Sequence, residues 1–542
     1  MGERDPHLNH WADHAAERTL RAHPDRKRVT VAAGITPSGV VHIGNFREII
    51  TVDLVARALR DRGVEVRFIY SWDDFDVLRK VPKDAPEQEM LTAQLGCSIA
   101  AVPDPWGEHD SYASHHIAAL QDSIGPLGIT PEFIRQSERY RAGAYAEGIQ
   151  KALAASDAIR EGLNASRRAN GARNMLPDEW LPLAGFCDNC GKDPLTFTWD
   201  GAWQVHYTCG ACEHQADVDI RKGGNLKLPW RVDWPMRWGY EQVCFEPGGK
   251  DHSSAGGSFD TAKTIVAETY DWTAPQYVGY DFVSIKGQGG KISSSKGGVV
   301  TVAECLQVYE PEVLRWMFAA YRPNTEFAIS FDLDVIKIYE DYDRMFRLAY
   351  GADDGGRKDK KRQTARRTIQ LSNVGHEPIE PGSAPPWLPA FRHLSTIVQI
   401  FEGDVAATRA YYVAEGQAMS EAEARRFDAR AACVWRWVEH YAPDDFRYQI
   451  RTDPKAVALA GEEATALGRM VEVLRNNPDA NDATLGSHLK DVLEGLSLER
   501  AALYPIVYDL LLGRDRGPKL STLLAAMGSA RALPLLSASL PA

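Results

Sequence analysis

A strand, a glycine-bearing turn, a helix and a second strand follow one another between residues 29 and 76. The apolar run 29–34 leads into the turn TPSGVVHIGN, residues 36–45. Apolar residues at helical spacing then continue to a stop signal at Gly63, and the β-prone run 64–70 follows. A helix that connects two strands in this way places them parallel in one sheet. We therefore predict an α/β protein with a Rossmann-type parallel-sheet catalytic domain.

The composition changes several times after this unit. Residues 85–180 look mostly helical, residues 181–225 are β-prone around two pairs of cysteines, and residues 226–300 are rich in glycine and tryptophan. Predominantly helical sequence follows residue 331. We expect the first half of the catalytic domain in 1–100, an inserted helical and zinc-ribbon connective region in 101–225, the second half of the catalytic domain in 226–330, and an all-α C-terminal domain in 331–542.

Two segments interrupt the helical C-terminal part. They are the basic run RKDKKRQTARR at 357–367 and a proline-rich stretch at 376–389. We expect an exposed excursion or a hinge there. The basic run could contact a phosphate backbone, although a charge run is more often a solvated loop.

The formal net charge of −12 speaks mildly against a purely electrostatic nucleic-acid binder, but it leaves room for a local basic face. The N-terminal residues are too charged for a signal peptide. No run approaches the roughly 20 apolar residues of a membrane span. We expect a cytoplasmic protein with no membrane partner.

Four of the eight cysteines form two CxxC pairs. Without a signal peptide such pairs indicate metal rather than disulfides, and their spacing fits a tetrahedral zinc ribbon. Four protein ligands leave no open position, so the expected role of zinc is structural. The alternatives are four unliganded thiols, or a site in which His214 replaces one cysteine. The predicted ligands are Cys187, Cys190, Cys209 and Cys212.

Two glycine-containing loops could bind phosphates. The first, PSGVVHIGN (37–45), precedes a helix whose N-terminal N–H groups can face an anion, and Gly39 and Gly44 allow close approach. The second, KGQGGKISSSKGG (286–298), could place Lys291 and Lys296 beside developing negative charge. Taken singly, each is equally well a plain strand–helix turn or a basic surface loop.

Together the two loops resemble the paired signatures of class I aminoacyl-tRNA synthetases, whose consensus strings are HIGH and KMSKS. Asn45 stands in place of the second histidine, and Ser294 in place of the second lysine. These variants resemble the class I lysyl-tRNA synthetase subfamily. Five further blocks, within about residues 25–350, are similar to it: SWDDFDVLRKVP (71–82), LPWRVDWPMRW (228–238), FEPGGKDHSSAGGSFDT (245–261), YDFVSIKG (280–287) and FDLDVIKIYEDYDRMF (331–346).

The resemblance implies activation of L-lysine with ATP and Mg²⁺, and transfer of the lysyl group to tRNA(Lys) by a monomer. Stem contact and anticodon reading would belong to residues 331–542. The implied catalytic residues are His42, Asn45, Lys291 and Lys296. The implied ATP-binding residues are Pro37, Ser38, Gly39, His42, Gly44, Asn45, Lys291, Ser293, Ser294 and Ser295. Whether Lys296 replaces the missing second lysine stays open.

A pocket for lysine needs acceptors for two ammonium groups and a wall for the aliphatic stem. Asp73 and Asp74 follow the second strand, at the sheet edge where such folds bind ligands, and which of them meets which ammonium group stays open. Clustered tryptophans between 230 and 238 could enclose the stem and hold its cationic end by cation–π attraction, although some must be core residues. By resemblance, the remaining pocket residues are Gly34, Thr36, Trp230, His252 and Tyr280.

Three other interpretations fit parts of the sequence. A glutamyl-type synthetase has a similar layout, but its substrate would require a cation in the pocket. A zinc-ribbon RNA-binding or regulatory protein could carry a retired synthetase domain, although both phosphate loops are intact. A specialised second copy of a lysyl enzyme would have the same chemistry.

Overall fold

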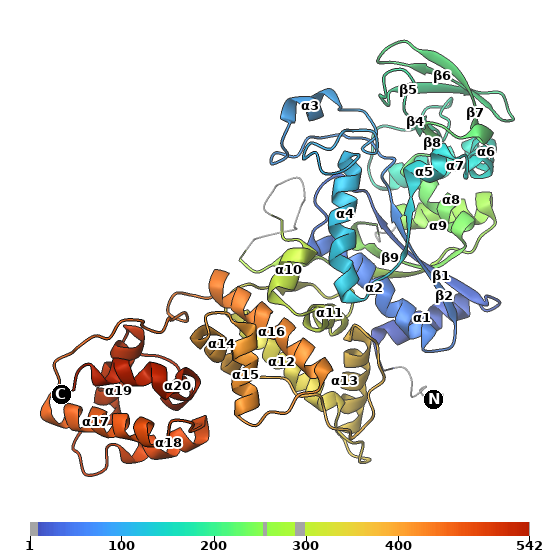
Figure 1. Ribbon diagram of the computed structural model, residues 1–542. Coiled ribbons are helices and arrows are strands. Elements are labelled where there is room, and N and C mark those ends of the chain that lie inside the picture. The colour runs from blue at the N-terminus through green and yellow to red at the C-terminus, as the bar shows by residue number, and fades with distance from the viewer. Residues whose placement is uncertain (1–8, 253–256, 288–298, 541–542) are drawn as a thin grey trace. The chain divides into compact units, whose positions relative to one another are not determined.

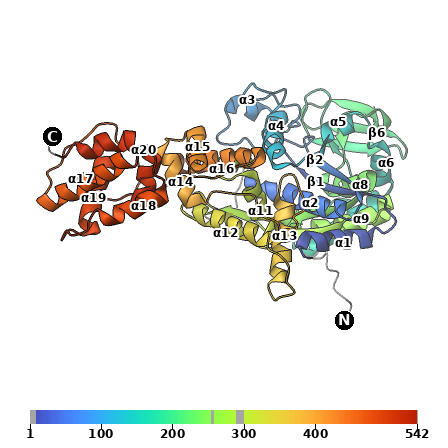
Figure 2. The same ribbon diagram turned by 60° about the horizontal axis from the view of Figure 1, so that its bottom comes forward.

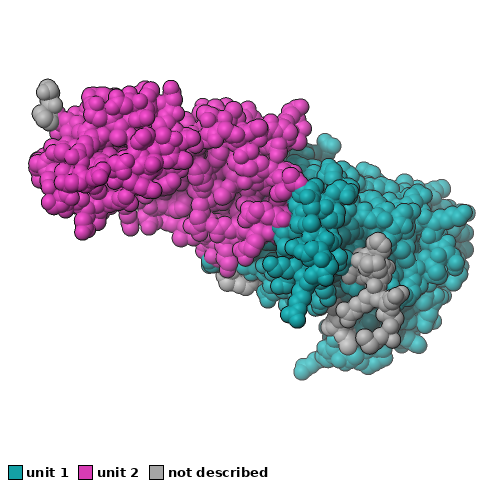
Figure 3. All heavy atoms as spheres, turned by 90° about the horizontal axis from the view of Figure 1, so that it is seen from below, with its two compact units in different colours: residues 1–305, 311–329, 348–383 teal, residues 306–310, 330–347, 384–542 magenta. Residues whose placement is uncertain are grey.

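The computed structural model describes residues 9–252, 257–287 and 299–540 (Figure 1). The chain forms two compact units, coloured teal and magenta in Figure 3. Unit 1 comprises Met1–Cys305, Pro311–Ile329 and Leu348–Ser383, and unit 2 comprises Leu306–Glu310, Ser330–Arg347 and Ala384–Ala542. Both units are therefore assembled from segments that are separated in the sequence.

A five-stranded parallel sheet forms the centre of unit 1. Its order is β10-β9-β1-β2-β3, with bounds Gln276–Tyr280, Val243–Gly249, Arg28–Ile35, Glu65–Trp72 and Glu132–Arg135. From β1 the chain winds through β2 and β3 to one edge, and later through β9 and β10 to the other. The strand order reverses between β1 and β9, which is where doubly wound sheets bind ligands. The predicted Rossmann-type fold is confirmed.

Helices cover both faces of this sheet (Figure 1). On one face lie α1 (Trp11–Ala22) and α2 (Ile43–Arg60), and α2 is buried along nearly its whole length. On the other face α8 (Trp230–Glu241) and α9 (Ser258–Tyr270) pack on apolar residues such as Ala32 and Ile69. Burial on both faces explains why β1 is an almost continuous apolar run rather than an alternating one.

The region between β2 and β9 carries the inserted elements. Its helices are α3 (Gln88–Ala93), α4 (Tyr112–Ile124), α5 (Gln136–Arg141), α6 (Ala146–Ala154) and α7 (Ser156–Ala169). An antiparallel sheet of β5 (Leu195–Trp199), β6 (Gln204–Cys209) and β7 (Gln215–Asp219) follows, next to the short pair β4 (Ala184–Gly185) and β8 (Leu226–Lys227). The β-prone texture of residues 181–225 thus corresponds to a small β module.

The remaining elements of unit 1 return to the sheet. A parallel pair, β11 (Val283–Ile285) and β12 (Phe327–Ile329), lies beside α2, and α11 (Pro311–Ala319) packs on α2 and on α13 (Asp359–Ser372). Helix α10 (Val302–Val308) begins in unit 1 and ends in unit 2.

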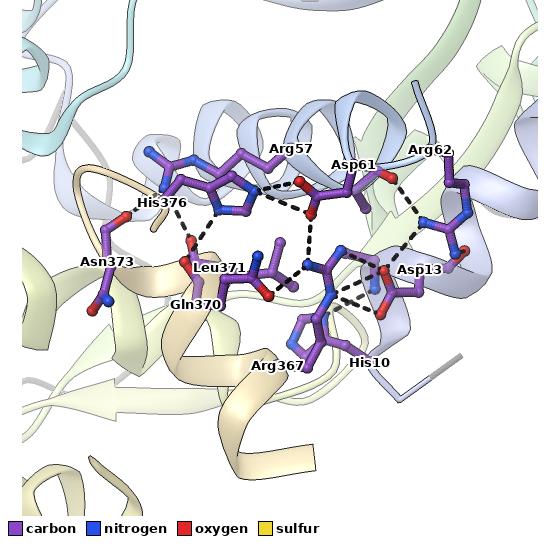
Figure 4. Close-up of polar contacts among 12 residues, drawn as sticks. His10, Asp13, Arg57, Asp61, Arg62, Arg367, Gln370, Leu371, Asn373 and His376 are labelled. Carbon is purple, nitrogen blue, oxygen red and sulfur yellow. Dashed lines mark hydrogen bonds and ion pairs between the residues drawn. The ribbon is translucent and has the colours of Figure 1, made fainter. Parts of the chain in front are cut away.

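Most of the basic run 357–367, expected to be an excursion or a hinge, lies in α13. Its last residue, Arg367, reaches Asp13 of α1 at 2.7 Å and Asp61, the C-cap of α2 (Figure 4). His376 contacts the other oxygen of Asp61 at 2.9 Å. Fully buried Arg315 of α11 donates to the carbonyls of Leu371 and Ser372 at the end of α13. This end of the run is therefore a structural anchor.

Unit 2 is helical throughout its described residues, as predicted for the C-terminal part (Figure 2). Its helices are most of α12 (Asp334–Ala349), then α14 (Phe391–Ile400), α15 (Val405–Ala414), α16 (Glu421–His440), α17 (Gly461–Asn476), α18 (Asp482–Asp491), α19 (Arg500–Leu512) and α20 (Leu520–Ser537). Fully buried Arg430 of α16 pairs with Glu310 at 3.0 Å and with Asp343 of α12 at 2.9 Å. This ion-pair network joins sequence-distant segments of the unit.

Among the described residues, one helix, α20, is long and apolar enough to cross a membrane by length and composition alone. It is kinked at Gly528 and packs against α14, α17, α18 and α19. Because 61% of the apolar window is buried within the protein, α20 has the character of a core helix of unit 2.

Candidate active site

A cavity of about 510 Å³ opens at the carboxyl ends of β1 and β9, where the strand order reverses. Its walls come from the end of β1, the start of α2, the segment after β2, helix α8, strand β9 and Tyr280 at the end of β10. Most of the residues assigned to lysine from the sequence line it, namely Gly34, Thr36, Asp73, Trp230, His252 and Tyr280.

The HIGN segment begins helix α2. The Nδ1 atom of His42 accepts the N–H of Asn45 at 3.3 Å, and the Oδ1 atom of Asn45 accepts the N–H of His42 at 3.1 Å. This reciprocal pair is a capping box. Because Nδ1 accepts, the neutral imidazole carries its proton on Nε2. A Cβ at Gly44 would lie 2.9 Å from the His42 ring, so a glycine is needed there.

Of the other residues assigned to the first phosphate loop, Pro37 and Gly39 are buried and Ser38 is exposed. The hydroxyl of Tyr112, on α4, donates to the carbonyl of Ser38 at 3.0 Å and supports the loop from the inserted region. The loop therefore has a fixed partner outside the β1–α2 unit.

The KISSSKG residues assigned from the sequence, Lys291, Ser293, Ser294, Ser295 and Lys296, lie outside the described residues. The segments on either side of them are described. Val283 lines the cavity, and the carbonyl of Val300 accepts the N–H of Ile43 at 2.8 Å. The flanks of the second phosphate loop thus lie beside the first, although some 250 residues separate the two in sequence.

The two aspartates of the SWDD block have different surroundings. Asp74 is fully buried and accepts hydrogen bonds from Arg135 and from the backbone and hydroxyl of Ser137, at 2.6–2.8 Å. It does not belong to the cavity lining. Asp73 lines the cavity and pairs with Arg237 of α8 at 2.7 Å. Of the two, only Asp73 has access to a ligand there.

Two further carboxylates of the cavity were not predicted from the sequence. Glu48, on α2, accepts the N–H of Gly34 at 3.0 Å and the hydroxyl of Tyr280 at 2.7 Å. Glu246, on β9, accepts both indole N–H groups of Trp234 and Trp238. Burial raises the pKa of Glu48 to about 7 and also raises the pKa of Glu246. Glu246 could have been found from the sequence, because it lies in one of the blocks that match the family. Glu48 could not, because it lies within an ordinary helical pattern.

The tryptophans of α8 divide between wall and core. Trp230 is 46% exposed and Trp238 only 1%, although both line the cavity. The rings of Trp230 and His252 meet edge to face at 5.8 Å. The expectation that some of these tryptophans belong to the core and others to the pocket agrees with this arrangement.

The four cysteines of the two CxxC pairs gather at one end of the β module. The Sγ atoms of Cys187 and Cys212 are 3.7 Å apart, as are those of Cys190 and Cys209, and all four lie within 4.8 Å of one another. A tetrahedron with Zn–S bonds of about 2.3 Å has sulfur atoms about 3.8 Å apart. The arrangement therefore fits zinc. His214 is not part of the group, and its carbonyl accepts the N–H of Cys209.

A second group of metal-ligating side chains lies before and within α4. The Nδ1 atoms of His115 and His109 lie 3.6 Å and 3.8 Å from the Oδ2 atom of Asp104. These separations are compatible with a divalent cation, and the sequence analysis did not identify the group. The spacing D-x₄-H-x₅-H crosses a loop and a helix start, so no periodicity revealed it.

Comparison with known proteins shows which family this chain belongs to. The family model described as tRNA synthetases class I (K) matches residues 9–375. The lysine–tRNA ligase of Borreliella burgdorferi is 43% identical over 522 residues, which cover 96% of this chain and 97% of the relative. The chain belongs to the class I lysyl-tRNA synthetase family.

The lysine–tRNA ligase of Pyrococcus horikoshii is 37% identical over 96% of this chain and 97% of its own length. Among solved structures, a glutamate tRNA ligase from Elizabethkingia meningosepticum has a TM-score of 0.45 at 13% identity, over 94% of this chain and 98% of that one. The resemblance seen in the sequence is confirmed, and the chain is an aminoacyl-tRNA synthetase. Membership implies ATP as a reactant of the family chemistry and Mg²⁺ as its cofactor.

Proposed function

We propose that this synthetase activates L-lysine with ATP to lysyl-adenylate and transfers the lysyl group to the 3′ end of tRNA(Lys). The observation that carries the proposal is the cavity at the carboxyl ends of β1 and β9, where the strand order of the sheet reverses. It joins the N-terminus of α2, which suits phosphates, to a chamber walled by carboxylates and tryptophans, which suits a cationic side chain.

Activation needs no side-chain nucleophile, because the carboxylate of lysine attacks the α-phosphate. The protein contributes positioning and charge stabilisation. His42 would donate from Nε2 to the phosphates at the start of α2, with Pro37, Ser38, Gly39, Gly44 and Asn45 shaping the loop. Lys291 and Lys296, with Ser293, Ser294 and Ser295, would meet the leaving pyrophosphate. Bound Mg²⁺ would neutralise phosphate charge.

The remaining assignments follow the same division of the chain. Gly34, Thr36, Asp73, Trp230, His252 and Tyr280 would contact lysine, and Cys187, Cys190, Cys209 and Cys212 would hold structural Zn²⁺. We infer that the catalytic domain lies in 1–100 and 226–330 together with strand β3 of the central sheet, the connective region in the rest of 101–225 and the tRNA-reading region in 331–542. A monomer in the cytoplasm is the form we expect.

Amino-acid-dependent ATP–pyrophosphate exchange, measured with each of the twenty amino acids, tests the proposal. Lysine alone should support rapid exchange, and the same protein should charge tRNA(Lys). Exchange with glutamate instead would favour the glutamyl interpretation. Exchange with no amino acid would favour a retired synthetase domain.

The second phosphate loop gives a sharper expectation. Lys291→Ala should slow exchange by roughly a hundredfold or more while the fold survives, because one contact to developing charge is removed. Circular dichroism would verify folding. Near-normal exchange in that variant would contradict the role given to Lys291.

A further inference from the structure

The turn between α11 and β12 lies against helix α2. It spans residues 322–325 and is closed by a hydrogen bond from the N–H of Thr325 to the carbonyl of Arg322, at 2.9 Å. Of its four residues only Pro323 is buried. Because the turn buries so little apolar surface, its position depends on the hydrogen bonds that it makes to the rest of the protein.

Arg47 supplies hydrogen bonds to this turn. It lies on α2, two residues after the HIGN segment, and is 2% exposed. Its Nη2 atom donates to the carbonyls of residues 322, 323 and 325 at 3.0, 2.6 and 3.0 Å. The guanidinium also lies over the ring of Phe327, in β12, at 5.1 Å. The other terminal nitrogen, Nη1, has no hydrogen-bond partner in the described part of the chain, so the turn is what compensates for burying this charge.

The turn in its place determines where strand β11 lies. Strands β11 and β12 pair in parallel along their whole length. At the end of β11, the N–H of Lys286 donates to the carbonyl of Ile329 at 2.9 Å. Before β11, the N–H of Asp281 donates to the carbonyl of Pro323, which also accepts a hydrogen bond from Arg47. Both ends of β11 therefore depend on the segment that Arg47 holds on α2.

The other flank of the second phosphate loop is fixed on the same part of α2. The carbonyl of Val300 accepts the N–H of Ile43, the first residue of α2, and His42 forms a β-bridge with Thr301. Arg47 lies one turn after Ile43. A single turn of α2 thus provides the contacts for both flanks, at the start of the helix for one flank and at Arg47 for the other.

We propose that Arg47 is a positioning residue for lysine activation, because it sets where β11 ends relative to His42 and hence where the second phosphate loop begins. Arg47 is not among the residues that line the cavity, so it would act through that loop. The inference therefore rests on the role proposed for Lys291. A displacement of about 1 Å, caused by a change far from the reacting atoms, can slow a reaction by about a hundredfold.

Two substitutions of Arg47 test the proposal in the full-length protein, by ATP–pyrophosphate exchange and by calorimetric titration with lysine. Arg47→Met removes the three hydrogen bonds to the turn. It should slow exchange by roughly a hundredfold and leave the dissociation constant for lysine within a few fold of the wild-type value. Arg47→Lys should restore most of the rate, because an ammonium group carries three N–H donors for the three carbonyls.

Arg315→Met is the matched control. It also removes a fully buried guanidinium that donates to three backbone carbonyls, among them those of Leu371 and Ser372 in α13, but none of them flanks the second phosphate loop. It should exchange at nearly the wild-type rate at a temperature where circular dichroism shows the variants to be folded. If Arg47→Met does not fold there, Arg47→Gln takes its place in the same measurements.

A double variant tests whether Arg47 acts through the loop. In the Lys291→Ala background, Arg47→Met should slow exchange by no more than a few fold further, because the contribution of the loop is already lost. A second loss of roughly a hundredfold there would mean that Arg47 acts independently of Lys291, and would overturn the proposal.

Three other results would also overturn it. They are normal exchange in Arg47→Met, lysine binding weakened by the same factor as exchange, and equal slowing in Arg315→Met, which would indicate a general loss of structure. The proposed function has a separate test in the single variant Lys291→Ala. If that variant exchanges normally, the role proposed for the loop fails. If it is slow while Arg47→Met is normal, only this inference fails.

Discussion

Asn45 occupies the position where the family consensus has a second histidine. Its side-chain oxygen accepts the backbone N–H of His42, and its backbone N–H donates to the His42 ring. The short side chain of asparagine suits this position, because its amide oxygen can accept the backbone N–H of the N-cap residue. The departure from consensus therefore keeps the start of α2 capped and fixes the imidazole. Glu48 lies one turn later on α2 and gives the cavity a group that titrates near neutral pH.

Lysine binding should depend on pH through Glu48. The pKa of Glu48 is raised from its ordinary 4.5 to about 7, chiefly by burial, so below about pH 7 the empty pocket holds a proton that an arriving ammonium group must displace. The KM for lysine should rise by up to about tenfold per pH unit below pH 7. Exchange assays from pH 5.5 to 8.5 would show this, and Glu48→Gln should flatten it.

Other groups that face Glu48 set the background of that experiment. They are Tyr70 of β2, Asp73 after β2, Glu246 of β9 and Tyr280 of β10. His42, His252 and Glu246 line the same cavity, so a pH effect that persists in Glu48→Gln would belong to one of them. In the ligand-free protein, the raised pKa of Glu48 makes low pH favourable to folding, whereas low pH is unfavourable to lysine binding. The free energy of unfolding should fall as pH rises from about 4.5 to about 7, and this fall should be absent in the variant.

At the scale of single elements, α13 is held by buried charge in addition to its buried apolar residues Ala365, Ile369 and Leu371. Arg315 is fully buried, pairs with Asp53 at 2.6 Å, and donates to carbonyls of Leu127, Leu371 and Ser372. Burial alone would raise the pKa of Asp61, but hydrogen bonds from His376 and Arg367 lower it below its ordinary value. The last carbonyls of a helix have no partner within the helix, and at the end of α13 Arg315 donates to them.

Arg315→Met should lower the free energy of unfolding by about 3–5 kcal/mol, because it leaves buried carbonyls without donors and weakens the pairing of Asp53. Urea unfolding would measure the change. Arg21→Met, which removes an exposed ion pair with Glu17, should shift it by no more than about 0.5 kcal/mol. Equal effects from the two changes would contradict the anchoring role of Arg315.

The cysteine module should depend on its metal. We expect about one zinc per chain in protein purified without chelator, and its loss in Cys209→Ser, because that change removes one of four thiolate ligands. Plasma emission spectrometry would count the metal. Protein that contains none would contradict an occupied site. Zinc that survives Cys209→Ser would belong to Asp104, His109 and His115.

Across the whole molecule, local periodicity predicted the β1–α2–β2 unit, the β module and the helical C-terminal part well. What it could not predict depends on contacts between distant segments. Glu246 faces the cavity only because β9 pairs with β1, and Asp74 turns away because Arg135 and Ser137, some 60 residues later, hold it. The last residue of the basic run, Arg367, likewise looked solvated because its partners, Asp13 and Asp61, are some 300 residues earlier.

Salt concentration should affect the two half-reactions differently, because only the second involves the anionic tRNA. Aminoacylation should fall steeply between 50 and 200 mM salt (about the range in which phosphate contacts weaken), because each contact releases counterions. Lysine-dependent exchange, which involves no tRNA, should change little. Exposed Lys358, Lys360 and Lys361 are the first contacts to test, and their replacement by glutamine should reduce the slope for aminoacylation. An unchanged slope would place the tRNA contacts elsewhere.

The pairing of β1 with β9 also matters while the chain is being made. About two hundred residues separate the end of β1 from the start of β9. At about 5–20 residues per second, a ribosome would need roughly 10–40 seconds to supply them. During that interval the nascent chain has an apolar strand with one open edge, a template for unwanted pairing. The order of the strands therefore predicts that a chaperone shields this half-built sheet until its second half emerges.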